Sequence, residues 1–226
     1  MPEPKIHDWF IEPREYERQE QRRGKRHAFE AIEASRAALV VIDMVPFFVE
    51  ESSYCRGVVP NIVRLAATLR GAGGSVAWVV PGSEPPHPKL AVEFFGDRIA
   101  ELFRTSGGTG DIRNRVWPEL APMAGDLYFE KQSSSAFFPG ASDLPAALLA
   151  RNTDTVFIAG TVTNICCESS ARDAAASGFR VIFLADGTAA RRDADHNATL
   201  HNIYRSFGDV RATSEVVEML RAGERS

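Results

Sequence analysis

Residues 156–174 read VFIAGTVTNICCESSARDA, and the rest of the chain is organised around this stretch. Four apolar residues, then Gly160 and a group of Thr and Asn cap candidates, predict a buried strand that turns directly into a helix. Cys166 falls in the first turn of that helix, where unsatisfied backbone N–H groups and the helix dipole favour an anion. A thiol in this position is expected to ionise more readily than in water, which makes Cys166 a candidate nucleophile.

The composition is that of a globular protein with a small-molecule partner. The chain has 226 residues, 44% hydrophobic and 25% charged, which is enough for one domain with a single large core. A formal net charge of -4 and a pI near 5.8 leave no basic field of the kind that binds nucleic acid. We therefore expect a small molecule as the partner and no nucleic acid.

The sequence also predicts a cytoplasmic protein without a membrane partner. The first 36 residues contain no apolar core behind a basic segment, and no apolar run approaches the length of a membrane span. The three cysteines include an adjacent pair, Cys166 and Cys167, which cannot both reach Cys55. Reduced thiols are the expected state.

The start of the chain differs in composition from the remainder. Residues 1–36 are predicted to form a polar N-terminal arm, and residues 37–226 a single domain. Between Pro13 and Ala34 the sequence is dense in Glu, Arg and Gln, as in a solvated helix or a loose arm. The arm is expected to be either an exposed appendage or a strap that wraps a neighbouring subunit.

The domain alternates between predicted strands and helices. Near-continuous apolar runs predict strands at 37–42, 75–80, 126–131, 155–159, 180–185 and 209–212, and helical patterns fall at 61–70, 143–150, 193–207 and 214–220. Pro60 is expected to open the first of these helices, and Asp143 to cap the second. This order predicts an α/β fold of three layers, α/β/α, with a mostly parallel, doubly wound central sheet. Ligands of such sheets bind beyond the carboxyl ends of the strands.

Residues 81–125 interrupt the alternation. They are rich in Pro and Gly, with one predicted helix near 93–103 and several aromatic side chains. A long excursion inside a compact α/β domain is commonly a lid or a pocket wall. Its aromatic residues are alternatively part of a minor core.

Three reactive side chains stand at or just past predicted strand ends. Asp43 is placed to take the proton of Cys166, and Lys131 to stabilise the resulting charge, while the strand-to-helix turn offers N–H donors for an oxyanion. Each residue also has a structural interpretation. A strand-terminal Asp is often a helix cap, a Lys after a strand is often solvated, and a small buried Cys is usually inert.

Four segments resemble, in order along the chain, the motifs of the isochorismatase-like cysteine hydrolases. They are the first-strand Asp motif at 41–44, the Lys segment at Lys131 with 135–138 and Leu144, the nucleophile segment at 160–174, and the C-terminal signature at His201 with 207–210. The resemblance runs from about residue 37 to residue 220. It implies the isochorismatase-like hydrolase fold for this domain.

The resemblance also implies roles for individual residues. Cys166 is the nucleophile, Asp43 is the base that activates it, and Lys131 is the partner of both. The peptide bond between Thr161 and Val162 is expected to be cis, so that the backbone N–H groups of Val162 and Cys166 form an oxyanion hole. Cys167 is expected to be a packed structural residue.

The sequence departs from the family pattern around the pocket. Val45 and Phe47 replace the usual Gln and acidic residue, and residues 79–83 lack the Asp-x-His motif of the metal-binding relatives. We therefore expect no metal and no cofactor. The substrate is expected to have an apolar portion, because aromatic side chains are the candidate pocket walls: Phe47, Phe48, Trp78, Trp117 and Phe138, with Phe94 and Phe95.

The leading hypothesis is a metal-independent cysteine hydrolase. It cleaves a linear amide, carbamoyl or ureido C–N bond of a small molecule through a thioester, and within the family it is closest in motif to the ureidoacrylate amidohydrolase and N-carbamoyl amidase branch. The alternatives are an isochorismatase-type vinyl-ether hydrolase, whose chemistry does not need the Cys, and a non-catalytic binding protein on the same fold. The resemblance further implies a homodimer or a homotetramer.

Overall fold

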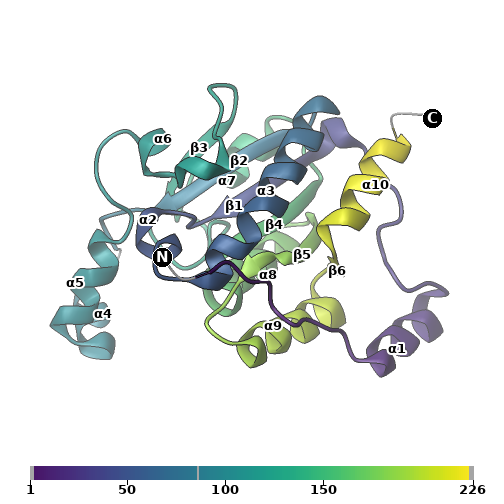
Figure 1. The fold of residues 1–226 in the computed structure, drawn as a ribbon, viewed down its shortest axis with the longest axis horizontal. Helices are drawn as coiled ribbons and strands as arrows, with labels where there is room; N and C mark the ends of the chain where they lie inside the picture. The colour runs from purple at the N-terminus through teal and green to yellow at the C-terminus, as the bar shows by residue number, and fades with distance from the viewer. Residues whose placement is uncertain (1–2, 86, 224–226) are drawn as a thin grey trace.

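A six-stranded parallel sheet forms the centre of the protein (Figure 1). The computed structural model describes residues 3–85 and 87–223. The strands lie in the order β3-β2-β1-β4-β5-β6, and every neighbouring pair is parallel. Their bounds are β1 Ala37–Ile42, β2 Ser75–Pro81, β3 Leu127–Lys131, β4 Thr155–Thr161, β5 Arg180–Ala189 and β6 Asp209–Arg211. The order reverses direction between β1 and β4, which confirms the doubly wound α/β fold.

Helices cover both faces of the sheet. One face packs against α3 (Ser53–Gly71) and α10 (Thr213–Gly223), which lie in front of the sheet in Figure 1. The other packs against α7 (Leu144–Leu149), α8 (Glu168–Ala176) and α9 (Asp193–Ser206). The remaining helices are α1 Pro13–Arg23, α2 Pro46–Val49, α4 Pro88–Phe95, α5 Asp97–Thr105 and α6 Ile112–Arg115, with single turns at η1 Ala34–Arg36, η2 Pro118–Leu120 and η3 Thr163–Cys167.

The apolar strands explain the two cores. All six residues of β1 are buried, and they alternate between the two faces of the sheet. Leu39 and Val41 belong to the core under α3 and α10, whereas Val40 and Ile42 belong to the core under α7, α8 and α9. A strand buried on both faces needs no polar side, which is why its sequence is a continuous apolar run.

The structure corrects one predicted helix start and one predicted side-chain cap. The helix predicted at 61–70 is α3, and it begins at Ser53, not at Pro60. The Ser52 hydroxyl accepts the N–H of Cys55 at 3.1 Å and caps the helix there. Pro60 lies inside α3. Asp143 makes no capping hydrogen bond to α7, and the N–H of Leu144 donates to the Ser142 hydroxyl at 3.2 Å instead.

Two further elements differ in extent from the prediction. β5 continues through Asp186 and Gly187 to Ala189, since a register shift against β4 lets pairing resume at Gly160 with Thr188. The helix predicted near 93–103 is two helices, α4 and α5, separated by Gly96 with φ 78°. None of their side chains is buried, and Figure 1 shows both helices projecting from the body of the protein.

The N-terminal arm packs on its own chain. α1 lies along α9, where the Gln19 amide donates to the Tyr204 carbonyl at 3.4 Å. Ile11 and Ile32 are buried in the two cores, so the arm is more than an exposed appendage. Its polar composition concealed this packing, because only a few of its side chains face the domain. The division at residues 36 and 37 stays a prediction.

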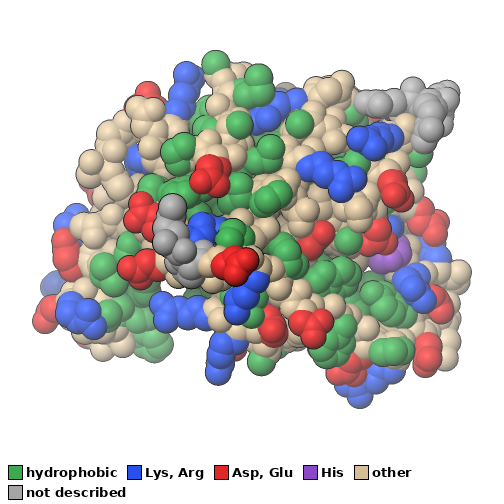
Figure 2. Space-filling view, viewed as in Figure 1, with side chains coloured by type: hydrophobic (Ala, Val, Ile, Leu, Met, Phe, Trp, Pro, Cys, Tyr) green, Lys and Arg blue, Asp and Glu red, His purple; other side chains and the backbone are tan. Residues whose placement is uncertain are grey.

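The surface carries both charges. On the face shown in Figure 2, Lys and Arg side chains are interspersed with Asp and Glu, without a broad region of one sign. In the part of the chain that the structure describes, no helix combines the length and the apolar character needed to cross a membrane.

The junction between β1 and β4 gives a stability prediction. Gly160 has φ 108°, and an added Cβ would lie 2.1 Å from the Ile42 carbonyl oxygen. We expect Gly160→Ala to lower the free energy of unfolding by about 3 kcal/mol or more. The measurement is chemical denaturation followed by circular dichroism.

Gly178→Ala is the matched control for this experiment. Gly178 also has a positive φ, 91°, but an added Cβ meets no atom within 4 Å among the described residues. Gly178→Ala should therefore lower the free energy of unfolding by only about 1 kcal/mol, which is the cost of placing alanine in this backbone conformation. Equal losses in the two variants would contradict the close-approach argument.

Candidate active site

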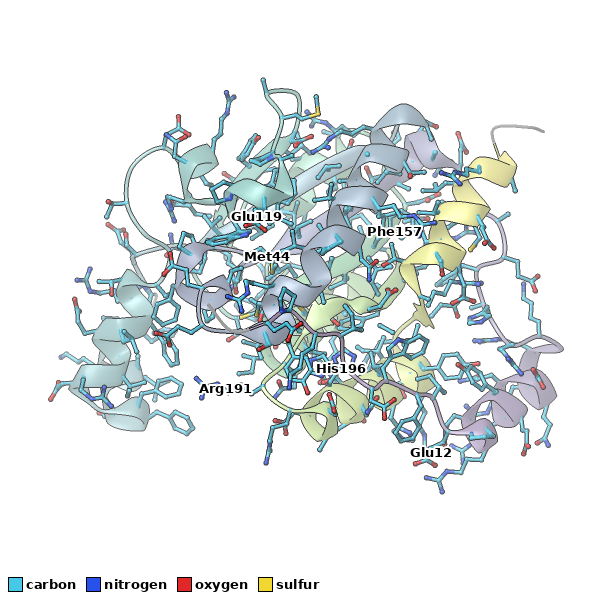
Figure 3. The ribbon with its side chains drawn as sticks, in the orientation of Figure 1. Glu12, Met44, Glu119, Phe157, Arg191 and His196 are labelled. Carbon is cyan, nitrogen blue, oxygen red and sulfur yellow. The ribbon has the colours of Figure 1, made fainter. Side chains whose placement is uncertain are left out.

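Three strand ends bring Asp43, Lys131 and Cys166 together. Asp43 directly follows β1, Lys131 is the last residue of β3, and Cys166 lies in η3, directly beyond β4. The carboxyl ends of parallel strands meet at one edge of a sheet, so the sheet order collects the three side chains there. In Figure 3, Met44 marks the place where the chain leaves β1 beside Asp43.

Lys131 lies at the centre of the group. Its ammonium is 2.9 Å from Asp43 Oδ2 and 3.5 Å from Cys166 Sγ, and it donates to the Ser133 carbonyl at 3.1 Å. The Lys131 and Asp43 side chains are only 4% and 1% exposed. The adjacent carboxylate and the sulfur raise the pKa of Lys131 against the effect of burial, so the ammonium stays charged.

The backbone directs the Asp43 carboxylate. Asp43 adopts the left-handed conformation with φ 55°, which Asp tolerates better than most residues, and its N–H donates to the Val79 carbonyl at 2.8 Å. Oδ1 is buried and has no hydrogen-bond partner among the described residues. Burial raises the pKa of Asp43, while Lys131 and the Cys166 thiol lower it. The carboxylate is therefore more basic than a free one and has an oxygen ready to receive a proton.

Cys166 lies in a tight turn between β4 and α8. The turn is π-helical and runs without a break into α8, so Cys166 lies in the first turn of the helix that follows β4, and this turn is π-helical instead of α-helical. The Val162 carbonyl accepts the N–H groups of Ile165 at 3.0 Å and Cys167 at 3.2 Å, and the Thr161–Val162 peptide is cis. Cys167 is fully buried, with its thiol directed at the Ala159 carbonyl at 3.8 Å.

The electrostatics correct one expectation about the nucleophile. Burial and the Asp43 carboxylate raise the pKa of the Cys166 thiol, and Lys131 offsets only part of this effect. The resting thiol therefore keeps its proton more firmly than a free one, contrary to the expectation drawn from the helix dipole. Ionisation of Cys166 has to be coupled to transfer of its proton to a base, and Asp43 is the adjacent one.

The aromatic pocket candidates lie in different environments. The expectation for Trp78 is wrong, because it is 1% exposed and its indole N–H donates at 2.7 Å to Asp126, just before the start of β3 and away from Lys131 at its end. Trp117 is buried in the core, although its backbone N–H donates to the Met44 carbonyl at 2.8 Å. Phe47 borders a hollow of about 280 Å³ together with Pro46 and residues 105–109.

The other predicted wall residues remain predictions. Phe48 packs edge-on against Phe47, with ring centroids 4.8 Å apart. Phe138, in the segment that follows Lys131, is 56% exposed. Phe94 and Phe95 lie on the projecting helix α4 and are exposed. Phe47 and Phe48 lie in α2, directly after the Asp43 end of β1, and the Trp117 backbone also reaches this end at Met44.

Two features at the carboxyl ends of β4 and β5 were missed at the level of sequence. Arg191 is exposed on the loop after β5, next to the end of β4, and forms no ion pair with a described residue, whereas its neighbour Arg192 pairs with Asp195. Figure 3 shows Arg191 directed toward the side on which α4 and α5 project. Thr163, inside the nucleophile turn, bonds to the ring of His196 at 3.0 Å. A lone Arg or His carries no periodic signal that would have singled it out.

No metal-binding cluster is visible near this site. Within residues 3–85 and 87–223, no three His, Cys, Asp or Glu side chains are grouped so as to hold a metal ion. The absence of a cofactor stays a prediction.

Comparison with known proteins places the chain in a family. The isochorismatase domain model matches residues 37–215, which is most of the chain. The protein therefore belongs to the isochorismatase family, as the motifs predicted.

Two curated relatives and one solved structure illustrate the similarity. The chain is 31% identical to maleamate amidohydrolase of Pseudomonas putida, over 81% of this chain and 86% of the relative. It is 28% identical to ureidoacrylate amidohydrolase RutB of Variovorax paradoxus, over 83% of this chain and 82% of the relative. A cysteine hydrolase from Pseudomonas syringae pv. phaseolicola superposes with a TM-score of 0.75 at 27% identity, covering 87% of this chain and 97% of that one.

The charge arrangement gives a prediction about thiol reactivity. Asp43→Asn removes the carboxylate that raises the Cys166 pKa and leaves the Lys131 ammonium in place, so the thiol pKa should fall. We expect alkylation of Cys166 by iodoacetamide at neutral pH to become faster, by about tenfold for each unit by which the pKa falls. Peptide mass spectrometry over a pH series measures the rate at each cysteine.

Cys55 and Cys167 serve as internal controls in the same samples. Both are buried and free, and their alkylation should stay slow in the wild type and in the variant. Slower alkylation of Cys166 in Asp43→Asn would show that the carboxylate promotes ionisation in the resting enzyme.

Proposed function

We propose that this protein is a metal-independent cysteine hydrolase that cleaves a linear amide, carbamoyl or ureido C–N bond of a small molecule. The observation that carries the proposal is the position of the Lys131 ammonium, within reach of both the Asp43 carboxylate and the Cys166 sulfur in a buried site. The named activities of the relatives support the choice of bond, since maleamate and ureidoacrylate amidohydrolases are both amidohydrolases.

The first half of the proposed reaction forms a thioester. The Cys166 S–H proton moves to Asp43 as the sulfur attacks the substrate carbonyl carbon, and the carbonyl π electrons move to oxygen. The backbone N–H groups of Val162 and Cys166 bind this oxyanion. When the carbonyl re-forms, the C–N bond breaks, and Asp43 gives its proton to the departing nitrogen. The products of this half are the amine or ammonia and an acyl group on Cys166.

The second half uses water to release the acid. Asp43, again a carboxylate, takes a proton from water as the water oxygen attacks the thioester carbonyl carbon. The C–S bond then breaks, and the proton on Asp43 returns to the sulfur. Lys131 stays protonated throughout and offsets the negative charge that moves between Asp43 and Cys166. The cycle ends with the protonated thiol that the resting site favours.

The alternatives make different demands on the same site. A vinyl-ether hydrolase of the isochorismatase type does not need a sulfur nucleophile, and a non-catalytic binding protein needs neither the thiol nor the buried ion pair. Burying the Asp43 carboxylate and the Lys131 ammonium is costly even when they pair, and neither alternative gives a reason to place this pair against a thiol. We also propose a homodimer or homotetramer, and the exposed apolar side chains of α4 and α5, such as Leu90 and Phe94, suit such an assembly.

Removal of the sulfur tests the proposal directly. Cys166→Ala should lower the kcat for release of ammonia or amine by about 10⁴-fold or more, because no other described group replaces the nucleophile. The measurement is a coupled ammonia assay on a panel of linear amides and ureido acids, including maleamate and ureidoacrylate. An isochorismate assay run in parallel tests the vinyl-ether alternative.

The adjacent Cys167→Ala is the matched control. Cys167 packs in the core below the turn, so its loss should lower stability and leave kcat within about twofold. A fully active Cys166→Ala protein would refute the thioester mechanism. A wild-type protein that binds members of the panel and converts none would favour the non-catalytic alternative.

The exposed guanidinium of Arg191 leads to a prediction about substrate charge. We infer that it binds a carboxylate of the substrate, since no described acidic side chain pairs with it. Arg191→Ala should raise KM for a carboxylate-bearing amide by about tenfold and leave KM for the neutral methyl ester of the same amide within about twofold.

Arg192→Ala controls for the general loss of positive charge. Arg192 is also exposed but already pairs with Asp195 at 2.7 Å. Its substitution should therefore affect both substrates little. An equal rise of KM for the acid and the ester in Arg191→Ala would contradict carboxylate recognition.

A further inference from the structure

The N-terminal arm occupies a site that α3 is shaped to receive. The N–H of Lys5 donates to the Ser53 carbonyl at 3.1 Å, and the arm crosses the helix at Gly57. A Cβ on Gly57 would lie 2.0 Å from the Lys5 carbonyl oxygen, and the three nearest atoms that it would meet all belong to the Lys5 backbone. Glycine is disfavoured in a helix interior, so its presence here serves the close approach of the arm.

Beyond this crossing, His7 is inserted between two aromatic rings. It stacks on Tyr54 with ring centroids 3.7 Å apart and on His196 at 4.1 Å, and its side chain is 0% exposed. Both ring nitrogens are used. The N–H of Ala190 donates to Nε2 at 2.9 Å, and Nδ1 lies 2.6 Å from Asp193 Oδ1. Nε2 accepts a bond, so the proton of the neutral ring is on Nδ1.

His196 connects this stack to the nucleophile turn. Its Nδ1 is 3.0 Å from the Thr163 hydroxyl. Thr163 is fully buried, and along the chain it lies between Val162 and Cys166. Burial lowers the pKa of His196 to about 3, so the ring is neutral. Figure 3 shows His196 beside the arm. The arm, the stack and the turn are thus one continuous packed series.

We propose that His7 is a positioning residue for the nucleophile turn: by stacking on His196 and bonding to Ala190 and Asp193, it holds Thr163, and with it Cys166, in place. This inference rests on the proposed function for its effect on turnover, but its effect on the turn itself is independent of the reaction. His7 lies outside residues 37–215, the part of the chain that the family model matches.

The same contacts make the docking of His7 dependent on pH. The groups that face the ring are the Asp193 carboxylate, the Lys5 ammonium, His196 and Tyr54. Burial lowers the pKa of His7 more than Asp193 raises it. Protonation of Nε2 would also break the hydrogen bond that it accepts from Ala190, because the new N–H of the ring would point at the N–H of Ala190. The arm is therefore docked most strongly above about pH 6.5, which is the ordinary pKa of a His side chain. Docking weakens as the pH falls below this value, because the undocked ring binds a proton more readily than the docked one.

The test compares four full-length variants, His7→Ala, Gly57→Ala, Phe10→Ala and His7→Phe, with the wild type. His7→Ala removes the stack and both hydrogen bonds. Gly57→Ala displaces the arm at Lys5 and leaves His7 and the turn unchanged in sequence. Phe10→Ala, whose side chain is 57% exposed, is the matched control within the arm. Hydrogen–deuterium exchange of amides 162–167 and kcat and KM on an accepted amide are measured for each.

We expect His7→Ala and Gly57→Ala to speed exchange at 162–167 by about fivefold or more and to lower kcat by about tenfold, with KM within about twofold. Phe10→Ala should match the wild type. At pH 5.5, after correction for intrinsic rates, the wild type should approach the His7→Ala pattern, while His7→Phe, which keeps a stacked ring without a titrating nitrogen, should exchange alike at both pH values.

Unchanged exchange at 162–167 in both His7→Ala and Gly57→Ala would overturn the proposal. If His7→Ala does not fold, Gly57→Ala decides, because alanine favours the helix itself. If the wild-type protein hydrolyses no amide, the proposed function fails, and the exchange data still decide whether the arm holds the turn.

Discussion

The contact between the Lys131 ammonium and the Asp43 carboxylate is the constraint on which the site depends. Both side chains are buried, and a buried charge without a partner costs several kcal/mol. The two residues come from β3 and β1, with β2 between them, so the contact requires the strands to end in register. Hydrogen bonds from Asp43 to Val79 and from Gly82 to the Lys131 carbonyl fix that register at the sheet edge.

This ion pair also determines the state of the thiol. A lone ammonium beside Cys166 would stabilise a thiolate, but the Asp43 carboxylate next to it has the opposite effect and prevails together with burial. The site therefore stores a protonated nucleophile and a base, rather than a preformed thiolate. The proposed chemistry starts only when a carbonyl carbon is present to receive the sulfur as its proton leaves.

Much of this arrangement follows from local sequence, and the rest depends on distant contacts. The apolar run that stops at Asp43 located the end of β1, because burial on both faces leaves a distinct pattern. The end of β3 at Lys131 was also predicted, although that strand is mostly half-buried and contains the exposed Glu130. The environment of Trp78 was not predictable, since an aromatic residue in a strand is equally compatible with a pocket and with a core. The direction of the Cys166 pKa shift depends on the balance of burial and two neighbouring charges, which spacing along the chain does not reveal. His7 was missed because its partners lie far away in sequence.

That separation bears on how the protein is made. His7 and Asp193, which bond to each other, are 186 residues apart in the chain. During synthesis the arm leaves the ribosome before the domain does, but its binding site is completed only after α9 has emerged. Contacts between such distant segments form late, because the loop between them has to close before they stabilise anything. The docked arm thus marks a domain that has folded as far as α9, and the turn that carries Cys166 acquires its full support only at that stage.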